Sequence, residues 1–96
     1  METVNILTRP SYLRSLKKFS AGENAEINTA IRLLHQAMGK PHVHSGLSIR
    51  KSGRVTFELR VGLRIRVLFA RESGDRVLVF AGDHNEVRAW LKENLR

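Results

Sequence analysis

The chain has 96 residues and a net charge of +8, from 17 lysines and arginines against 9 aspartates and glutamates. Its length predicts one domain over residues 1–96. The charge indicates an anionic partner, most often nucleic acid but also an acidic protein. The lack of cysteine excludes disulfides and thiolate metal sites. We expect a cytoplasmic protein that does not enter a membrane, because neither a signal peptide nor a membrane-length apolar run is visible.

A strand and a short helix are predicted at the start of the chain. Residues 3–7 are short and apolar, which is typical of a first strand. Thr8 can cap the following helix, and Pro10 suits its first turn, where a missing amide hydrogen does no harm. The apolar side of this helix is formed by Tyr12, Leu13, Leu16 and Phe19.

The second helix has the clearest pattern in the chain. Ser20 and Glu23 have the spacing of a capping box at its start. Gly39 suits the position just past its end, and Pro41 prevents its continuation. Its apolar stripe is formed by Ile27, Ile31, Leu34 and Met38. The two helices, roughly 10–38, therefore predict a helical hairpin that covers the apolar face of a sheet.

A central hairpin of two strands organises the rest of the chain. Residues 55–61 alternate between apolar and polar side chains, residues 65–71 do so at first, and the apolar sets must meet on one face. That condition predicts a three-residue turn at 62–64. The predicted facing pairs are Val61 with Ile65, Leu59 with Val67, and Phe57 with Phe69.

The same register places Arg60 directly opposite Arg66 on the other face. Opposed like charges destabilise a sheet by up to about 1 kcal/mol. The arrangement is explained if an anion binds between them, or if Glu58, which is diagonal to Arg66, neutralises one of them. The two alternatives are a phosphate-binding face and a solvated basic face with one ion pair.

Two further strands and a terminal helix complete the predicted elements. Residues 47–51 alternate as a strand before the central hairpin, and 76–81 are apolar at almost every position, as in a strand buried on both faces. Asp83 and Glu86 form a second capping box, which places His84 in the first turn of the last helix. The apolar face of that helix is formed by Val87, Trp90 and Leu91.

The candidate chemistry is RNA cleavage without a metal or cofactor. His42 and His44 form only a weak metal motif, so no metal site is expected. Cleavage of RNA needs a base for the 2′-hydroxyl, cations for the charge on phosphorus, and an acid for the leaving oxygen. Histidine suits proton transfer near neutral pH. The residues that offer this set are Glu58, Arg60, Arg66 and His84, although His84 also fits a residue that merely starts a helix.

The order of elements, together with the segments E-L-R-V-G-L-R-I-R-V-L-F, G-D-H-N-E-V and H-S-G-L-S-I-R-K, resembles the RelE/ParE superfamily of type II toxin–antitoxin toxins. The resemblance covers essentially the whole chain. It implies an α+β fold in which an N-terminal helical hairpin packs on one face of a small antiparallel sheet, with a C-terminal helix. It also implies a ribosome-dependent mRNA endonuclease that is silenced by an acidic antitoxin, through which the toxin can oligomerise.

Individual residues carry this resemblance further. Arg66 matches the arginine in the strand after the hairpin turn, and His84 matches the catalytic histidine of some branches. Arg60 matches a basic position on the preceding strand. The chain departs from the pattern at Thr56 and Glu58, which replace a lysine pair, and an aromatic residue of some members is replaced by arginine. The candidate RNA-binding residues are Arg50, Lys51, Arg54, Arg64 and Arg88.

Two alternative functions stay open at this point. A gyrase poison of the ParE type shares the superfamily and needs no catalytic set, but the G-D-H-N-E-V segment favours cleavage. The other alternative is a nucleic-acid-binding or degenerate toxin domain without activity. An adjacent reading frame for an acidic antitoxin would favour any of the toxin functions.

Overall fold

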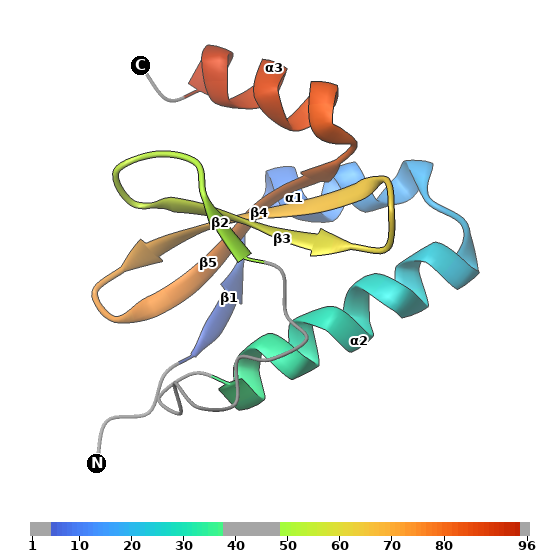
Figure 1. Ribbon diagram of the computed structural model, residues 1–96, viewed down its shortest axis with the longest axis horizontal. Helices are drawn as coiled ribbons and strands as arrows, with labels where there is room; N and C mark the ends of the chain where they lie inside the picture. The colour runs from blue at the N-terminus through green and yellow to red at the C-terminus, as the bar shows by residue number, and fades with distance from the viewer. Residues whose placement is uncertain (1–4, 38–48, 95–96) are drawn as a thin grey trace.

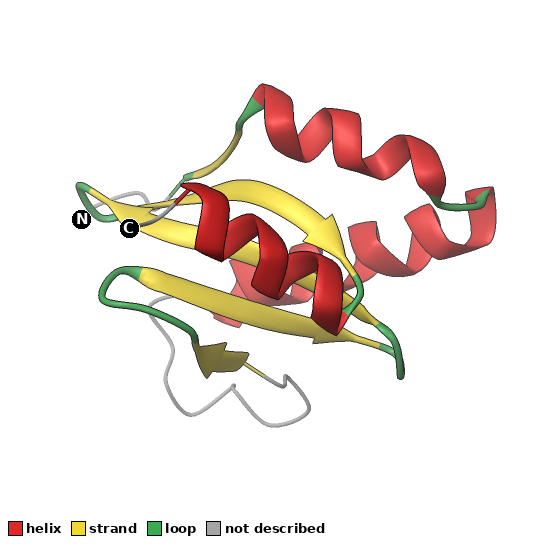
Figure 2. Cartoon of the chain, turned by 90° about the horizontal axis from the view of Figure 1, so that it is seen from above, coloured by secondary structure: helices red, strands yellow, loops and turns green. Residues whose placement is uncertain are grey.

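The computed structural model describes residues 5–37 and 49–94 of the chain. Their elements are β1 (Ile6–Thr8), α1 (Pro10–Ser15), the 3₁₀ turn η1 (Leu16–Lys18), α2 (Ala21–Ala37), β2 (Ile49–Lys51), β3 (Thr56–Val61), β4 (Ile65–Glu72), β5 (Asp75–Gly82) and α3 (His84–Asn94). The strands form one sheet in the order β1-β5-β4-β3-β2 (Figure 1). α3 lies across one face of this sheet and α2 across the other (Figure 2).

The described part of the chain leaves some predictions outside its bounds. The expected end of the second helix, at 38–41, and the pair His42 and His44 lie outside the described residues. None of the described helices combines the length and the apolar character that crossing a membrane requires.

The α+β class is confirmed, but the predicted all-antiparallel sheet is wrong at one edge. β1 runs parallel to β5, with Ile6 opposite Arg76 and Thr8 opposite Leu78. The other three pairings are antiparallel. A parallel neighbour requires a long crossover between the two strands. Here everything from α1 to β4 serves as that crossover, so no local pattern in β1 signals its direction.

The predicted register of the central hairpin is confirmed. Val61 lies opposite Ile65 and Arg60 opposite Arg66, with the three-residue turn between them. Gly62 adopts a φ of 63°, which glycine tolerates without strain. The rings of Phe57 and Phe69 stack with their centroids 5.5 Å apart.

A β-bulge shifts the register between β4 and β5. Leu68 lies opposite Phe80, whereas Phe69 lies opposite Leu78, so Val79 is an extra residue in β5. The extra residue reverses the alternation of side chains after it. Leu78 consequently packs on the α2 side and Phe80 on the α3 side, and β5 is buried on both faces, as its composition predicts.

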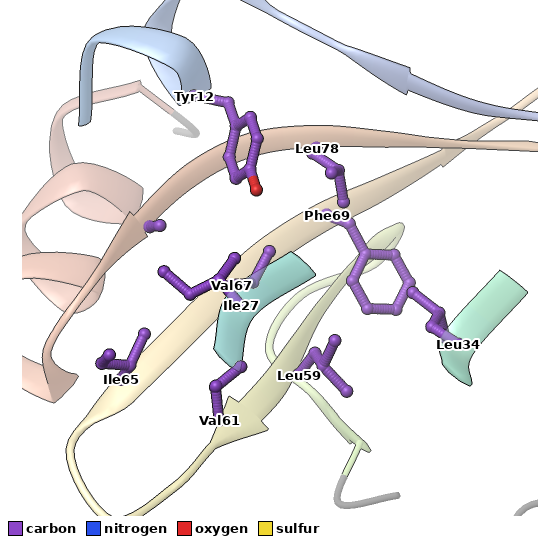
Figure 3. Close-up of a cluster of buried hydrophobic side chains, with 10 residues drawn as sticks. Tyr12, Ile27, Leu34, Leu59, Val61, Ile65, Val67, Phe69 and Leu78 are labelled. Carbon is purple, nitrogen blue, oxygen red and sulfur yellow. The ribbon is translucent and has the colours of Figure 1, made fainter. Parts of the chain in front are cut away.

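The larger core lies between the sheet, α1 and α2 (Figure 3). α1 lies along β5, and α2 lies along β3. The buried members of this cluster are Tyr12, Ile27, Leu34, Leu59, Val61, Ile65, Val67, Phe69, Leu78 and Ala81. Burial raises the pKa of the Tyr12 phenol to about 12, and its hydroxyl has no hydrogen-bond partner among the described residues.

The first helix differs from its prediction in two details. Thr8 ends β1 instead of capping the helix, and the cap is Arg9, whose backbone is extended and whose side chain makes no capping hydrogen bond. Leu13 was expected on the apolar side, yet it is 53% exposed. α1 has only six residues before it tightens into η1, so Tyr12 and Ser15 face the sheet and Leu13 faces solvent.

Two serines of α1 complete the hydrogen bonding of β5 beyond the end of β1. Ser11 Oγ donates to the carbonyl of Val79 at 2.6 Å. The amide of Ala81 donates to Ser15 Oγ at 3.0 Å, and that hydroxyl donates in turn to the carbonyl of Tyr12 at 2.6 Å. The outer edge of β5 is therefore covered first by a strand and then by a helix.

Candidate functional site

A hollow of about 340 Å³ opens between α3 and the strands β2 and β3. Its walls carry three cations, one histidine and one carboxylate. The lining residues are Arg50, Lys51, Ser52, Glu58, His84, Arg88 and Leu91. We call this space the cationic hollow. Its positive charge suits an anionic ligand, and His84 and Glu58 are groups that could transfer protons to or from that ligand.

His84 is held at the mouth of this hollow by the start of α3. The capping box is confirmed, since Glu86 N donates to Asp83 Oδ1 at 2.8 Å and Asp83 N donates to Glu86 Oε1 at 2.9 Å. Gly82 precedes it in a position without room for a side chain, because a Cβ there would lie 2.9 Å from both Phe80 and Glu86. His84 therefore sits at the positive end of a helix dipole, which favours negative charge.

A second anchor ties the start of α3 to η1. Lys18 Nζ lies 3.2 Å from Glu86 Oε2, and its ammonium also lies 4.6 Å from the centre of the Phe80 ring. Phe80 stacks on Trp90 of α3 with ring centroids 5.9 Å apart. One lysine therefore contacts both the capping box and the aromatic pair under the helix.

Glu58 and Arg66 form a close electrostatic pair behind the cationic hollow. Arg66 Nε lies 3.8 Å from Glu58 Oε1, and the side chains are only 20% and 13% exposed. That distance is too long for a hydrogen bond. Arg66 Nη1 is buried and has no hydrogen-bond partner within the described residues. This nitrogen therefore carries the cost of a buried cationic donor without an acceptor.

The two opposed arginines go to different surroundings. Arg66 is largely buried beside Glu58, whereas Arg60 is exposed and lines a separate hollow with Glu26 and Leu33 of α2. This separation relieves the like-charge contact that the register creates. Arg50 lies directly opposite Glu58, so the carboxylate has a cation on either side of it.

Arg64 and Arg54 lie outside the cationic hollow. Arg64 Nη2 lies 3.3 Å from Glu23 Oε2, near the start of α2. The backbone amide of Ser20 lowers the pKa of Glu23, and Arg64 contributes to the same shift. Arg54 lines a neighbouring hollow. The structure thus brings five predicted residues into the cationic hollow, with Arg66 in contact behind it: Arg50, Lys51, Glu58, His84 and Arg88.

Two residues of the hollow were not predicted from the sequence. His84, Arg88 and Leu91 are spaced four and three residues apart, which places them on one side of a helix. That spacing could have identified Leu91. Ser52 lies in the turn after β2, and no sequence signal identifies it. Among the described residues there is no group of three or more histidines, aspartates or glutamates arranged to hold a metal ion.

Comparison with known proteins identifies the fold. No protein-family model matches the chain, and a comparison with curated proteins also gives no match. Among solved structures, the RelB–RelE antitoxin–toxin complex of Methanococcus jannaschii matches with a TM-score of 0.66 and 12% identity, over 88% of this chain and 96% of that one. A copper-bound mutant toxin of Helicobacter pylori matches with a TM-score of 0.63 and 13% identity, over 88% and 98%.

A third match lies in another archaeal complex. The RelE–RelB complex of Pyrococcus horikoshii gives a TM-score of 0.60 at 9% identity, over 85% of this chain and 96% of that one. These similarities run along nearly the whole of each matched chain, although the sequences have diverged widely. The chain therefore has a RelE-like fold, which is the fold that its sequence resembles.

Proposed function

We propose that this chain, over residues 1–96, is the toxin of a type II toxin–antitoxin pair and cleaves mRNA on the ribosome without a metal ion. The observation that carries the proposal is the cationic hollow, in which Arg50, Lys51 and Arg88 surround Glu58 and His84. The fold supports it, since two of the matched structures are complexes of a RelE toxin with its RelB antitoxin.

The proposed reaction is an internal transesterification. The 2′-oxygen of a ribose bonds to the neighbouring phosphorus as the bond from phosphorus to the 5′-oxygen breaks. The products are a 2′,3′-cyclic phosphate and a 5′-hydroxyl. A base removes the proton of the 2′-hydroxyl, and an acid supplies a proton to the departing oxygen. Cations stabilise the negative charge that builds on phosphorus between these steps.

His84 and Glu58 are the proposed proton-transfer groups. His84 takes the role of the acid, because its imidazole is exposed at the start of α3, where it is accessible to the departing oxygen, and histidine is able to transfer protons. Glu58 takes the role of the base. In the alternative role, Glu58 serves only as the counter-ion that orients Arg66.

Arg66 supplies charge to phosphorus in this scheme. While Glu58 is ionised, its carboxylate at 3.8 Å partly neutralises the positive charge of Arg66. Once Glu58 accepts a proton it becomes neutral, and the full charge of Arg66 then stabilises the phosphoryl oxygens. The unpaired Nη1 provides a donor for one of those oxygens. Arg60 lies opposite Arg66 on the neighbouring strand β3 and adds a second positive charge from the exposed side of that strand.

The remaining cations are proposed to bind the RNA backbone. Arg50, Lys51 and Arg88 lie within the hollow and reach the phosphates on either side of the reacting one. Arg54 extends this surface. Arg64 contributes less, because its guanidinium is already paired with a carboxylate. An acidic antitoxin in the same cytoplasmic compartment would compete for this surface, and assembly through the antitoxin is the proposed route to larger oligomers.

The test is regulated expression in a bacterial host, with and without an adjacent acidic reading frame, combined with mapping of mRNA ends. Purified protein is then added to programmed ribosomes and to free RNA. We expect ribosome-dependent cleavage by the wild type, loss in His84→Gln and Arg66→Ala, and wild-type activity in the control Arg14→Ala, which alters an exposed cation on α1. Growth arrest with intact mRNA would refute cleavage and leave the gyrase poison as the function.

Glu58→Gln separates the two roles of the carboxylate. The amide cannot accept the proton of the 2′-hydroxyl, but it can still contact Arg66 through its oxygen. If Glu58 is the base, this change is expected to lower the rate of RNA cleavage about 10²–10⁴-fold. It is also expected to remove the fall in rate at acidic pH from the pH–rate profile. Retention of that fall would show that Glu58 is only a counter-ion.

A further inference from the structure

We infer that a second hollow, which adjoins the cationic hollow, binds the base of the nucleotide next to the reacting phosphate. This hollow has a volume of about 500 Å³. It is lined by Ser52, Gly53, Arg54, Val55, Thr56, Leu91 and Asn94. We call it the base hollow. The inference rests on the proposed function only in assuming that the cationic hollow holds an RNA phosphate.

The two hollows adjoin and differ in chemistry. Ser52 and Leu91 belong to the walls of both, so the hollows lie side by side along α3 and the turn after β2. The cationic hollow carries three basic side chains, whereas the base hollow carries one, Arg54, and adds Val55, which is 49% exposed, to the shared Leu91. A charged space beside an aliphatic one matches the alternation of phosphate and base along a nucleic acid strand.

The wall of the base hollow is already formed by a tight turn. Ser52 N donates to the carbonyl of Thr56 at 2.9 Å, and Ser52 Oγ donates to Thr56 Oγ1 at 3.3 Å. Gly53 packs so closely that a Cβ at this position would collide with the hydroxyl of Thr56. The carbonyl of Val55 accepts a hydrogen bond from β4 at 2.9 Å. Ligand sites of about 300–1,000 Å³ are usually preformed in this way, apolar with a few polar groups.

Arg54 and Asn94 are the polar groups that would recognise the base. Unstacked RNA bases commonly lie against the plane of an arginine guanidinium and are read at their edges by hydrogen bonds. Asn94 Nδ2 donates to the carbonyl of Trp90 at 2.9 Å. Its carbonyl oxygen receives no hydrogen bond from the described residues, and because Asn94 lines the hollow we assign this oxygen as the acceptor for the base.

A free acceptor selects bases that carry an exocyclic amino group. Adenine, cytosine and guanine have this group, whereas the only edge donor of uracil is its ring N3–H, which is flanked by two carbonyl oxygens that repel the acceptor. The base hollow is therefore a site for an amino-bearing base, and Asn94 is its specificity-determining residue. We expect a preference of about tenfold over uracil, which is the size of one base-edge contact.

The experiment is a titration of the isotope-labelled full chain with adenosine, cytidine and uridine, followed by NMR. Adenosine and cytidine are expected to shift the methyl signals of Val55 and Leu91 and the side-chain amide of Asn94, and uridine is expected to bind about tenfold more weakly. The amide of Asn28, an exposed asparagine on α2, is the internal control. Ribose 5-phosphate, which lacks a base, is expected to shift His84 without shifting Val55.

Absence of nucleoside shifts at Val55 and Leu91 would overturn the inference, and so would equal binding of uridine. If an acidic antitoxin segment shifts these methyl groups while the nucleosides do not, the hollow belongs to the protein partner. The titration needs no catalysis, so a wild type that never cleaves RNA refutes the proposed function without deciding this site. In an active protein, Asn94→Ala is expected to flatten the base preference at the cleavage site, whereas Asn28→Ala leaves it unchanged.

Discussion

Replacement of Tyr12 by phenylalanine is expected to stabilise the fold. The Tyr12 side chain lies in the larger core, is 2% exposed, and has no partner for its hydroxyl among the described residues (Figure 3). A buried hydroxyl without a partner costs about 1–3 kcal/mol. Phenylalanine keeps the ring and removes only the oxygen, so part of this cost is recovered. We expect the free energy of unfolding to rise by about 1 kcal/mol near neutral pH.

The wild type is expected to lose stability at alkaline pH as Tyr12 ionises, and the same change is expected to remove this loss. Burial raises the pKa of Tyr12 from 10.0 to about 12, so the folded state holds the phenolic proton more tightly than the unfolded state. The resulting stabilisation is fully present below pH 10 and is lost as the pH rises toward 12. A hundredfold difference in acidity corresponds to at most about 2.7 kcal/mol. The phenylalanine variant has no such loss.

The assay is urea unfolding of both proteins at a series of pH values, with the difference between them plotted against pH. Tyr12 is the chain's single tyrosine, so phenolate absorbance reports its titration alone. The advantage of the variant is expected to grow above pH 10, as the wild type loses stability. A variant less stable than the wild type at neutral pH, or a tyrosine that titrates near 10, would refute the reasoning.

Other changes test the fold and the site. Ser15→Ala removes the acceptor of the buried Ala81 amide and is expected to lower the free energy of unfolding in urea by about 1–3 kcal/mol. Gly82→Ala is expected to cost about 1–3 kcal/mol in the same assay, through collision with the residues around it. In ribosome cleavage assays, Arg66→Ala is expected to lower the cleavage rate about 10²–10³-fold, and Arg66→Lys is expected to restore only part of it. His84→Gln is expected to lower the rate about 10²–10⁴-fold. Circular dichroism checks that each variant is folded. Association with an acidic antitoxin is expected to slow as salt rises; a rate indifferent to ionic strength would contradict an electrostatic partner.

The central hairpin could be predicted because its information is local. Val61 and Ile65 belong to alternating runs separated by three residues, and only one register puts both apolar sets on one face. Both capping boxes were predictable for the same reason, since each cap and its glutamate are three residues apart. The contact of Glu58 with Arg66 also follows directly from this register.

The parallel edge and the bulge could not be predicted, because their causes are not local. Residues 76–81 are apolar at nearly every position, so no alternation marks Val79 as the extra residue. The direction of β1 relative to its neighbour depends on how β5, about 70 residues later in the chain, comes to lie beside it. In the site, the ion pair of Arg64 with Glu23 could not be predicted either, because it spans 41 residues and leaves no trace in either segment.

The covered edge of β5 has a consequence for aggregation. Residues 77–81 read V-L-V-F-A, an uncharged run without proline that is well suited to pair with copies of itself in extended form. In the folded chain β4 occupies one edge of this run, while β1 and the serines of α1 occupy the other. Local detachment of α1 would uncover hydrogen-bonding groups of this uncharged strand while the rest of the sheet stays intact. Precipitation of this protein is therefore expected to follow the opening of a six-residue helix, at conditions milder than those that unfold the whole chain.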